Sequence, residues 1–226
     1  LLAQIDAAIG GKTGINVKST KNMVGSFYPA NHTLIDPLFL LTQSRREFSC
    51  GMAEMIKAAV LADADFFKFL ENNVSTLLRR RLDVLLAAVE GAARIKLEIV
   101  AEDLLDRTGR RALLNLGHTL GHALESVSEF DLRHGEAVAI GMVLATRLAV
   151  KLGHCDPSVL KRLISLLESA GLPTTVPEYP IEPILAKVKL DKKRSHHVLQ
   201  FVIPTEIGQA KLLPLGYDKL QLAFED

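Results

Sequence analysis

Residues 115–125 read NLGHTLGHALE, a helix-forming run in which two glycines each stand immediately before a histidine. A glycine inside a helix costs roughly 0.5–1 kcal/mol relative to alanine. Gly117 and Gly121 therefore need a compensating role. That role is either close packing or the close approach of another group.

The histidines of this run favour a metal site. His118 and His122 are four residues apart and lie on one helical face, and His134 follows closely in the sequence. Glu54 occupies an otherwise apolar helix face, where a carboxylate is costly to bury unless a cation or a metal pairs with it. Two histidines and a carboxylate form a sound catalytic zinc set with an open position. Spacing alone leaves open a packed histidine pair and a simple ion pair between Glu54 and Lys57.

The composition is that of a globular chain. Its 226 residues are 48% hydrophobic, enough for one large domain or two small ones. With 27 basic and 26 acidic side chains the net charge is +1, so we expect no nucleic-acid or anionic-membrane partner. Cys50 and Cys155 are too few and too far apart for a thiolate zinc cluster, which leaves nitrogen and oxygen ligands. Without a membrane-length apolar run or a signal-peptide pattern, we expect a soluble, cytoplasmic protein.

Hydrophobic periodicity predicts a mainly α fold. Residues 1–44 are rich in glycine and turn residues, and we expect strands and loops there, HTLID at 32–36 included. Residues 45–226 are predicted to be mainly helical, with a small β-hairpin around Gly208. The helices are predicted at 45–63, 65–72, 75–103, 112–127, 134–152, 157–170 and 217–225.

A second set of side chains is cationic and together suits an anionic substrate that carries phosphate and carboxylate. The set consists of Lys12, Lys21, Lys57, Lys96, Arg111, Lys192 and Lys193. Taken singly, each is also consistent with a solvated surface charge. GGKT invites a nucleotide-binding interpretation, but the Walker pattern needs a glycine where this chain has Asp6, and the chain contains no G-x-G-x-x-G element after a strand.

Six motifs follow one another and cover nearly the whole chain: QIDAAIGGKTGIN, KNMVGSFYPA, GMAEMIK, RALLNLGHTLGHALE, RHGEAVAIGM and LDKK. In this order they closely resemble the motifs of the 3-dehydroquinate synthase family of sugar phosphate cyclases. The resemblance implies zinc, or cobalt, bound by Glu54, His118 and His134, with His122 at the substrate site. It also implies that the glycines of the 115–125 run let substrate and metal approach the helix backbone.

The resemblance further implies a reaction. NAD transiently oxidises a hydroxyl of 3-deoxy-arabino-heptulosonate 7-phosphate, phosphate leaves, and reduction and an aldol closure give 3-dehydroquinate. The substrate contacts it implies are Asp6, Lys12, Asn22, Lys57, Lys96, Arg111, Asn115, His122 and Lys192 or Lys193. The NAD contacts it implies are Lys12, Lys21, Phe39, Thr42 and Glu47. A homodimer is expected for the full-length enzyme.

Two features depart from the family pattern. The stretch between Lys96 and Arg111 is one residue longer than the usual spacing, which makes the assignment of Lys96 less direct. The family's N-terminal nucleotide-binding domain would precede QIDAAIGG. The resemblance therefore implies that residues 1–44 are a junction at the boundary of that domain and that residues 45–226 are the helical zinc- and substrate-binding domain. By itself the chain should bind zinc, bind NAD poorly because the pyrophosphate loop is absent, and not turn over substrate.

Three alternatives remain at this point. Another sugar phosphate cyclase, making an inosose or a valiolone, would use the same zinc ligands, although Asn115 and the DKK run favour the dehydroquinate pattern. Metal-dependent alcohol dehydrogenase relatives share the architecture but lack the phosphate-binding cations. A non-catalytic metal-binding fragment is also compatible with every proposed ligand.

Metal binding should depend on pH, because the neutral imidazole is the ligand form. For free histidines, metal binding is expected to weaken below about pH 6.

Overall fold

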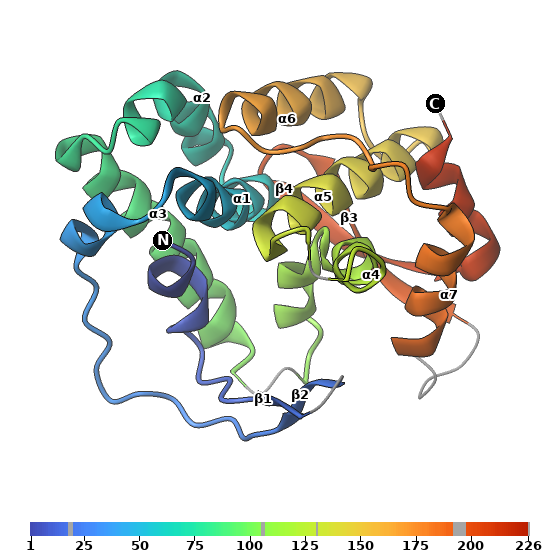
Figure 1. Ribbon diagram of the computed structural model, residues 1–226, viewed down its shortest axis with the longest axis horizontal. Helices are drawn as coiled ribbons and strands as arrows, with labels where there is room; N and C mark the ends of the chain where they lie inside the picture. Colours follow the sequence, from blue (N-terminus) through green and yellow to red (C-terminus); the bar gives the residue numbers. More distant parts are fainter. Residues whose placement is uncertain (18–19, 105–106, 130, 192–197, 226) are drawn as a thin grey trace.

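The computed structural model describes residues 1–17, 20–104, 107–129, 131–191 and 198–225. Among these residues, a helical body carries two separate antiparallel sheets of two strands each (Figure 1). This arrangement confirms the prediction of a mainly α fold with a short β segment near the N-terminus and a hairpin near the C-terminus.

The elements follow one another along the chain without a repeat. The α-helices are α1 (Arg45–Ala62), α2 (Ala64–Leu78), α3 (Leu82–Glu102), α4 (His118–Val127), α5 (His134–Lys151), α6 (Pro157–Ser169) and α7 (Ile181–Asp191). The shorter helical turns are η1 (Ala3–Ala7), η2 (Pro37–Thr42), η3 (Arg111–Asn115) and η4 (Tyr217–Phe224). The strands are β1 (Ile15–Val17), β2 (Thr20–Val24), β3 (Val198–Glu206) and β4 (Gln209–Gly216).

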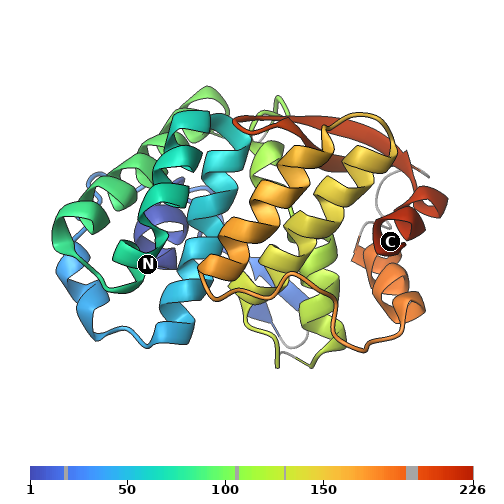
Figure 2. The same ribbon diagram turned by 90° about the horizontal axis from the view of Figure 1, so that it is seen from above.

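Helices α1 and α5 form the centre of the molecule. Helix α5 contacts α1, α4, α6, β3 and η4, whereas α1 contacts α2, α3, α5 and β4. Most residues of both helices are buried, as is typical of helices surrounded by other elements. The β3–β4 hairpin lies across one side of this helical layer (Figure 2). In the part of the chain that the structure describes, no helix is both long and apolar enough to traverse a lipid bilayer.

The N-terminal segment lies at the edge of the helical body. Helical turn η1 packs on α3, and strands β1 and β2 pair beside an extended stretch that leads to η2 (Figure 1). The expected strand character of residues 32–36 is wrong, because this stretch has no strand partner and Leu34 is 98% exposed. The two helical turns η1 and η2 were not expected from the sequence.

The boundary between α2 and α3 differs from the prediction. A break was expected near residues 73–74, but α2 continues to Leu78 because the Asn73 side chain donates to the Phe69 carbonyl within the helix. The break occurs instead around Arg80, which adopts a φ of 57° and donates to the carbonyls of Leu41 and Gln43. Helix α7 was also not predicted. Its buried residues Ile184 and Val188 are four positions apart, a weak helical signal.

Candidate functional site

The two glycines of the 115–125 run serve helix packing. Gly117 has a φ of 77° and precedes α4, so the predicted continuous helix at 112–127 is wrong: the 3-10 turn η3 ends and α4 begins at His118. A side-chain carbon on Gly117 would lie 2.7 Å from the Val138 carbonyl oxygen, and one on Gly121 would lie 3.0 Å from that of Ala137. Helix α5 therefore occupies the space that the resemblance reserved for substrate and metal, and that expectation is wrong at these two positions.

Glycines of α5 complete this close packing. A side-chain carbon on Gly141 would lie 2.0 Å from the carbonyl oxygen of Gly117 before α4, and one on Gly135 would lie 2.2 Å from that of Cys50 in α1. Because no alanine fits at these contacts, the backbones of α1, α4 and α5 approach one another closely. The first residues of α4 and α5 are thereby brought beside the middle of α1.

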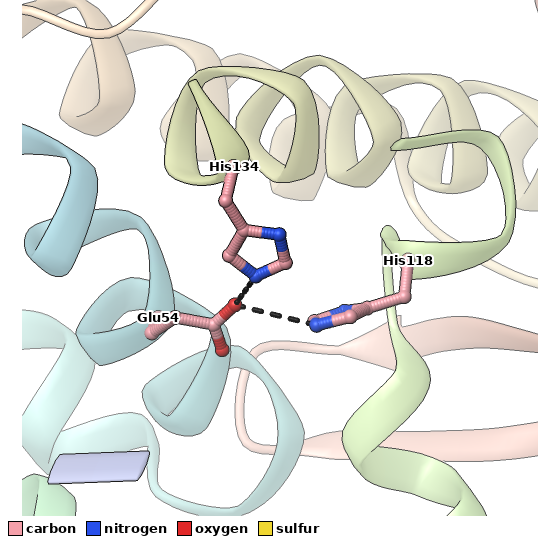
Figure 3. A group of neighbouring side chains, drawn as sticks. All are labelled: Glu54, His118 and His134. Atoms are coloured by element: carbon pink, nitrogen blue, oxygen red, sulfur yellow. Dashed lines mark hydrogen bonds and ion pairs between the residues drawn. The ribbon is translucent and has the colours of Figure 1, made fainter. Parts of the chain in front are cut away.

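A carboxylate and two histidines meet where the three helices converge (Figure 3). Glu54 Oε1 lies 3.2 Å from His134 Nε2 and 3.4 Å from His118 Nε2. The candidate ligand atoms of all three residues lie within 4.8 Å of one another. Ligands at zinc's usual bond lengths of roughly 2.0–2.2 Å stand about 3.4 Å apart in a tetrahedron. The donor set and its spacing therefore fit a zinc ion.

The orientation of His118 also favours a cation between these groups. Its Nδ1 lies 3.1 Å from the Leu116 carbonyl oxygen, which can only accept, so Nδ1 carries the proton and donates. Burial lowers the pKa of His118 to about 3, with the Lys57 charge acting in the same direction, so the ring is neutral. The lone pair of Nε2 then faces the Glu54 carboxylate. Because both groups are hydrogen-bond acceptors and cannot bond to each other, a cation between them stabilises the arrangement.

The pKa of His134 is shifted upward, in contrast to that of His118. Burial alone would lower its pKa, but hydrogen bonds to Glu125 and Glu54 outweigh burial and raise the pKa to about 9. For Glu54, burial opposes ionisation, yet the nearby Lys57 ammonium and the two histidines hold its pKa well below the usual range. The ionisable side chains of this cluster thus shift one another's pKa values.

Glu54 takes part in both arrangements that its sequence position suggested. Its Oε2 forms an ion pair with Lys57, and its Oε1 faces the two histidines. Both Glu54 and Lys57 are only 3% exposed. The ion pair and the candidate metal site therefore share one carboxylate, one oxygen for each.

Further residues of the predicted substrate set lie around this cluster. The ring of His122, one turn after His118 on α4, stands 5.3 Å from that of His118 and 5.9 Å from that of His134. Lys96 on α3 forms an ion pair with Asp6 of η1. Burial lowers the pKa of Lys96 against the pull of Asp6, and the charge of Lys57 lowers it further, which places the two lysines within electrostatic reach.

Arg111 is buried and holds the N-terminal segment. Its guanidinium donates to the carbonyls of Leu104 and Gly10 at 2.8 Å each and lies over the Phe27 ring. Gly10 has a φ of 99°, and a side-chain carbon there would lie 2.6 Å from the guanidinium. The Arg111 backbone N–H donates to Asp103, which also accepts from two N–H groups of the preceding loop. In this structure Arg111 links the helical body to the segment around Gly10.

The remaining predicted residues lie apart from the cluster or outside the described part. Asn115 is exposed at the end of η3, and Lys12 is exposed near Phe27. Phe39, Thr42 and Glu47 are exposed on η2 and the first turn of α1; Glu47 precedes Glu54 by two helical turns, about 10 Å along the axis. Lys192 and Lys193, and the side chains of Lys21 and Asn22, lie outside the described residues.

Sequence reasoning missed one residue of the cluster, Glu125. Its Oε2 lies 3.4 Å from His134 Nδ1, and it is 5% exposed. A signal was present in the sequence, because Glu125 is three residues after His122 and seven after His118 and so lies on the same face of α4.

Comparisons with known sequences point to one family. A family described as 3-dehydroquinate synthase C-terminal matches residues 51–194, and one described as 3-dehydroquinate synthase N-terminal matches residues 1–50. A 3-dehydroquinate synthase from Dictyoglomus turgidum is 42% identical over 214 residues, which cover 94% of this chain and 60% of the relative. One from Dehalococcoides mccartyi is 43% identical over 210 residues, covering 93% and 58%. The chain spans about 60% of the length of these relatives.

Solved structures agree on the fold. The 2-epi-5-epi-valiolone synthase from Streptomyces hygroscopicus subsp. jinggangensis 5008, with NAD+ and Zn2+ bound, is 31% identical with a TM-score of 0.90. The match covers 98% of this chain and 62% of that one. A 2-deoxy-scyllo-inosose synthase is 23% identical with a TM-score of 0.87, covering 98% and 64%.

Proposed function

This chain belongs to the 3-dehydroquinate synthase family, and on that premise we propose that it supplies the metal- and substrate-binding part of a 3-dehydroquinate synthase. The proposed reaction eliminates phosphate from 3-deoxy-arabino-heptulosonate 7-phosphate and closes the carbon ring, with NAD reduced and reoxidised within one turnover. The observation that carries the proposal is the convergence of Glu54, His118 and His134 at the spacing of zinc ligands, with the His118 lone pair aimed at a buried carboxylate.

The metal ligands of the proposal are Glu54, His118 and His134. When bound, zinc polarises the substrate hydroxyl that NAD oxidises and the carbonyl that results. The valiolone synthase structure at 31% identity, which holds NAD+ and Zn2+, supports this cofactor pair. Glu54 would supply negative charge to the cation, and its Oε2 forms the ion pair with Lys57.

Two lysines are proposed to bind the anionic groups of the substrate: Lys57, which is buried, and Lys96, which is partly buried. In the described part of the chain, Lys57 forms an ion pair with Glu54, and Lys96 forms one with Asp6. Both ammonium groups repel each other, so phosphate or carboxylate oxygens entering between them relieve that repulsion. Such fixed cations hold the substrate in one orientation through the successive steps.

His122 is proposed to act on the substrate and not on the metal. It lies on the same face of α4 as His118, one helical turn further along the chain. Its ring centroid is within 6 Å of the ring centroids of both proposed histidine ligands. An imidazole there is placed to contact the phosphate or to carry a proton during elimination.

The other assignments of the proposal come from the family resemblance. Substrate contacts include Arg111, Asn115, Asn22 and Lys192 or Lys193. NAD contacts include Lys12, Lys21, Phe39, Thr42 and Glu47. The complete enzyme is proposed to be a cytoplasmic homodimer.

One alternative has its own support. The structural likeness to a valiolone synthase leaves a second cyclase specificity to consider. The relatives named 3-dehydroquinate synthase are more similar, at 42–43% identity against 31%. The higher sequence identity therefore favours 3-deoxy-arabino-heptulosonate 7-phosphate, which carries a carboxylate, as the substrate.

Phosphate release tests the proposal. The purified chain, zinc, NAD and 3-deoxy-arabino-heptulosonate 7-phosphate are combined with the N-terminal portion of a relative, supplied as a separate polypeptide or fused. We expect phosphate release that requires zinc and NAD, and little release from a heptulose 7-phosphate without the carboxylate. Equal release from the substrate that lacks the carboxylate would support the alternative cyclase.

A further inference from the structure

Glu125 connects helix α4 to the proposed metal ligand at the start of α5. Its Oε2 lies 3.4 Å from His134 Nδ1, and the other ring nitrogen of His134, Nε2, lies 3.2 Å from Glu54. We propose that Glu125 is a positioning residue: it accepts a hydrogen bond from the Nδ1–H of His134 and so keeps Nε2 unprotonated and aimed at the metal. This inference rests on the metal site proposed above.

The burial of the Glu125 side chain supports this positioning role. Glu125 is 5% exposed, and a carboxylate is seldom buried without a partner that offsets its desolvation. Its carboxylate faces the imidazole of His134, which belongs to a different helix, α5. The contact therefore bears directly on the ring orientation of His134.

The two proposed histidine ligands are oriented in the same manner. His118 donates its Nδ1–H to the Leu116 carbonyl, and His134 is placed to donate its Nδ1–H to Glu125. In both rings the remaining nitrogen, Nε2, faces Glu54 Oε1. Partners of this kind fix the tautomer and raise the basicity of a metal-binding histidine, a carboxylate more than a carbonyl.

The turn between α4 and α5 keeps Glu125 in place. Ser128 Oγ donates to the Glu125 carbonyl at 3.0 Å and accepts from the Leu132 N–H at 3.3 Å. At the far end of this turn, Glu136 accepts from the Arg133 N–H at 2.9 Å and forms a two-point ion pair with Arg46 on α1. The hydrogen bonds fix Glu125 relative to the beginning of α5, where His134 lies.

A second metal at Glu125 is the competing explanation. His122, Glu125 and His134 also offer ligand atoms within 4.8 Å of one another. That ion would have to bind His134 Nδ1, and with a first ion on Nε2 the imidazole would lose both ring protons. The geometry therefore favours a hydrogen bond at Nδ1 and a single ion at Nε2.

Metal affinity tests the inference without an activity assay. Zinc dissociation constants are measured by competition with a chromophoric chelator for the full chain and for Glu125→Gln, Glu125→Ala and Glu129→Gln. We expect about a 10- to 100-fold weaker affinity for Glu125→Ala, as is usual for loss of such a partner, and a smaller loss for Glu125→Gln, whose amide oxygen still accepts. Glu129→Gln makes the same chemical change on an exposed side chain four residues away and should bind zinc as the parent does.

A second measurement uses the unmutated protein and does not depend on variants that fold. In the zinc-loaded, 15N-histidine-labelled chain, His134 should show a protonated Nδ1 and a metal-bound Nε2. Metal bound to Nδ1, a stoichiometry of two, or unchanged zinc affinity in a folded Glu125→Ala variant would each overturn the inference. His118→Ala separates this failure from that of the metal site: if His118→Ala also leaves zinc affinity unchanged, the proposed site itself is wrong.

Discussion

A side-chain carbon on Gly141 would lie 2.0 Å from the carbonyl oxygen of Gly117. The first glycine belongs to α5, which begins with His134, and the second precedes α4, which begins with His118. The distance between two proposed metal ligands thus depends on the absence of a methyl group between the helices that carry them.

Gly141→Ala should therefore disturb both stability and metal binding. The added carbon meets backbone atoms, which cannot rotate away, and overpacking of this kind costs about 1–3 kcal/mol. We expect a lower melting temperature and weaker zinc affinity, measured by calorimetry and chelator competition. Gly91→Ala is the matched control, because its added carbon would meet the Phe66 ring of α2, remote from the histidines in sequence and able to rotate. Equal zinc affinity in both variants would contradict this role of the glycine contact.

Zinc binding should release about one proton near pH 7. The pKa of His134 is raised to about 9, above the usual value of about 6.5, so its ring is charged at pH 7 and must lose a proton before Nε2 binds a cation. His118, with a pKa of about 3, is already neutral and releases none. Apparent zinc affinity should rise up to about tenfold per pH unit between pH 7 and 8 and level off above about 9.

Calorimetry in two buffers of different ionisation enthalpy measures this proton release. The structure moves the pH window upward from the value of about 6 expected for free histidines, because Glu125 and Glu54 stabilise the charged ring of His134. Zinc binding with a heat independent of the buffer would show that no proton is displaced. That result would remove His134 from the ligand set or show that its ring is neutral before binding.

His122→Ala should separate metal binding from turnover. His122 is outside the set of three residues around Glu54, so the variant should retain zinc after dialysis, as measured by elemental analysis. In the complete enzyme, turnover should fall by about 100-fold or more, the usual contribution of a positioned acid or base. His118→Ala is the contrasting variant and should lose both. Loss of zinc from His122→Ala would instead favour the pair of histidines four residues apart as ligands.

The exposed apolar side chains of the N-terminal segment should promote self-association of this chain. Phe27, Tyr28, Leu34 and Phe39 are 43%, 76%, 98% and 74% exposed. We expect concentration-dependent oligomers in sedimentation velocity experiments that decrease in the double variant Leu34→Ser, Phe39→Ser. The double variant Leu86→Ser, Leu97→Ser on α3, with side chains 52% and 54% exposed, is the control. An equal decrease in the control would locate the effect elsewhere.

Local sequence was sufficient for much of the fold. Capping residues and apolar periodicity placed α1, α5, α6 and the β3–β4 hairpin close to their observed bounds, because these signals act between neighbouring residues. Local signals failed where distant residues decide. The α2–α3 break is held by Arg80 bound to carbonyls near residue 42, and the strand expected at 32–36 has no partner to pair with.

For the site, the sequence by itself determined which residue types are present and, through the family motifs, that Glu54, His118 and His134 belong together. Spacing could not choose between His122 and His134, because helical periodicity relates residues of one helix only. The tertiary structure packs three helices at glycine contacts and so aims one imidazole from each of α4 and α5 at a carboxylate of α1, an arrangement that favours His134 as the proposed ligand. It also decided the protonation of each histidine, because burial and the neighbouring Leu116 carbonyl or Glu125 carboxylate are properties of the folded chain alone.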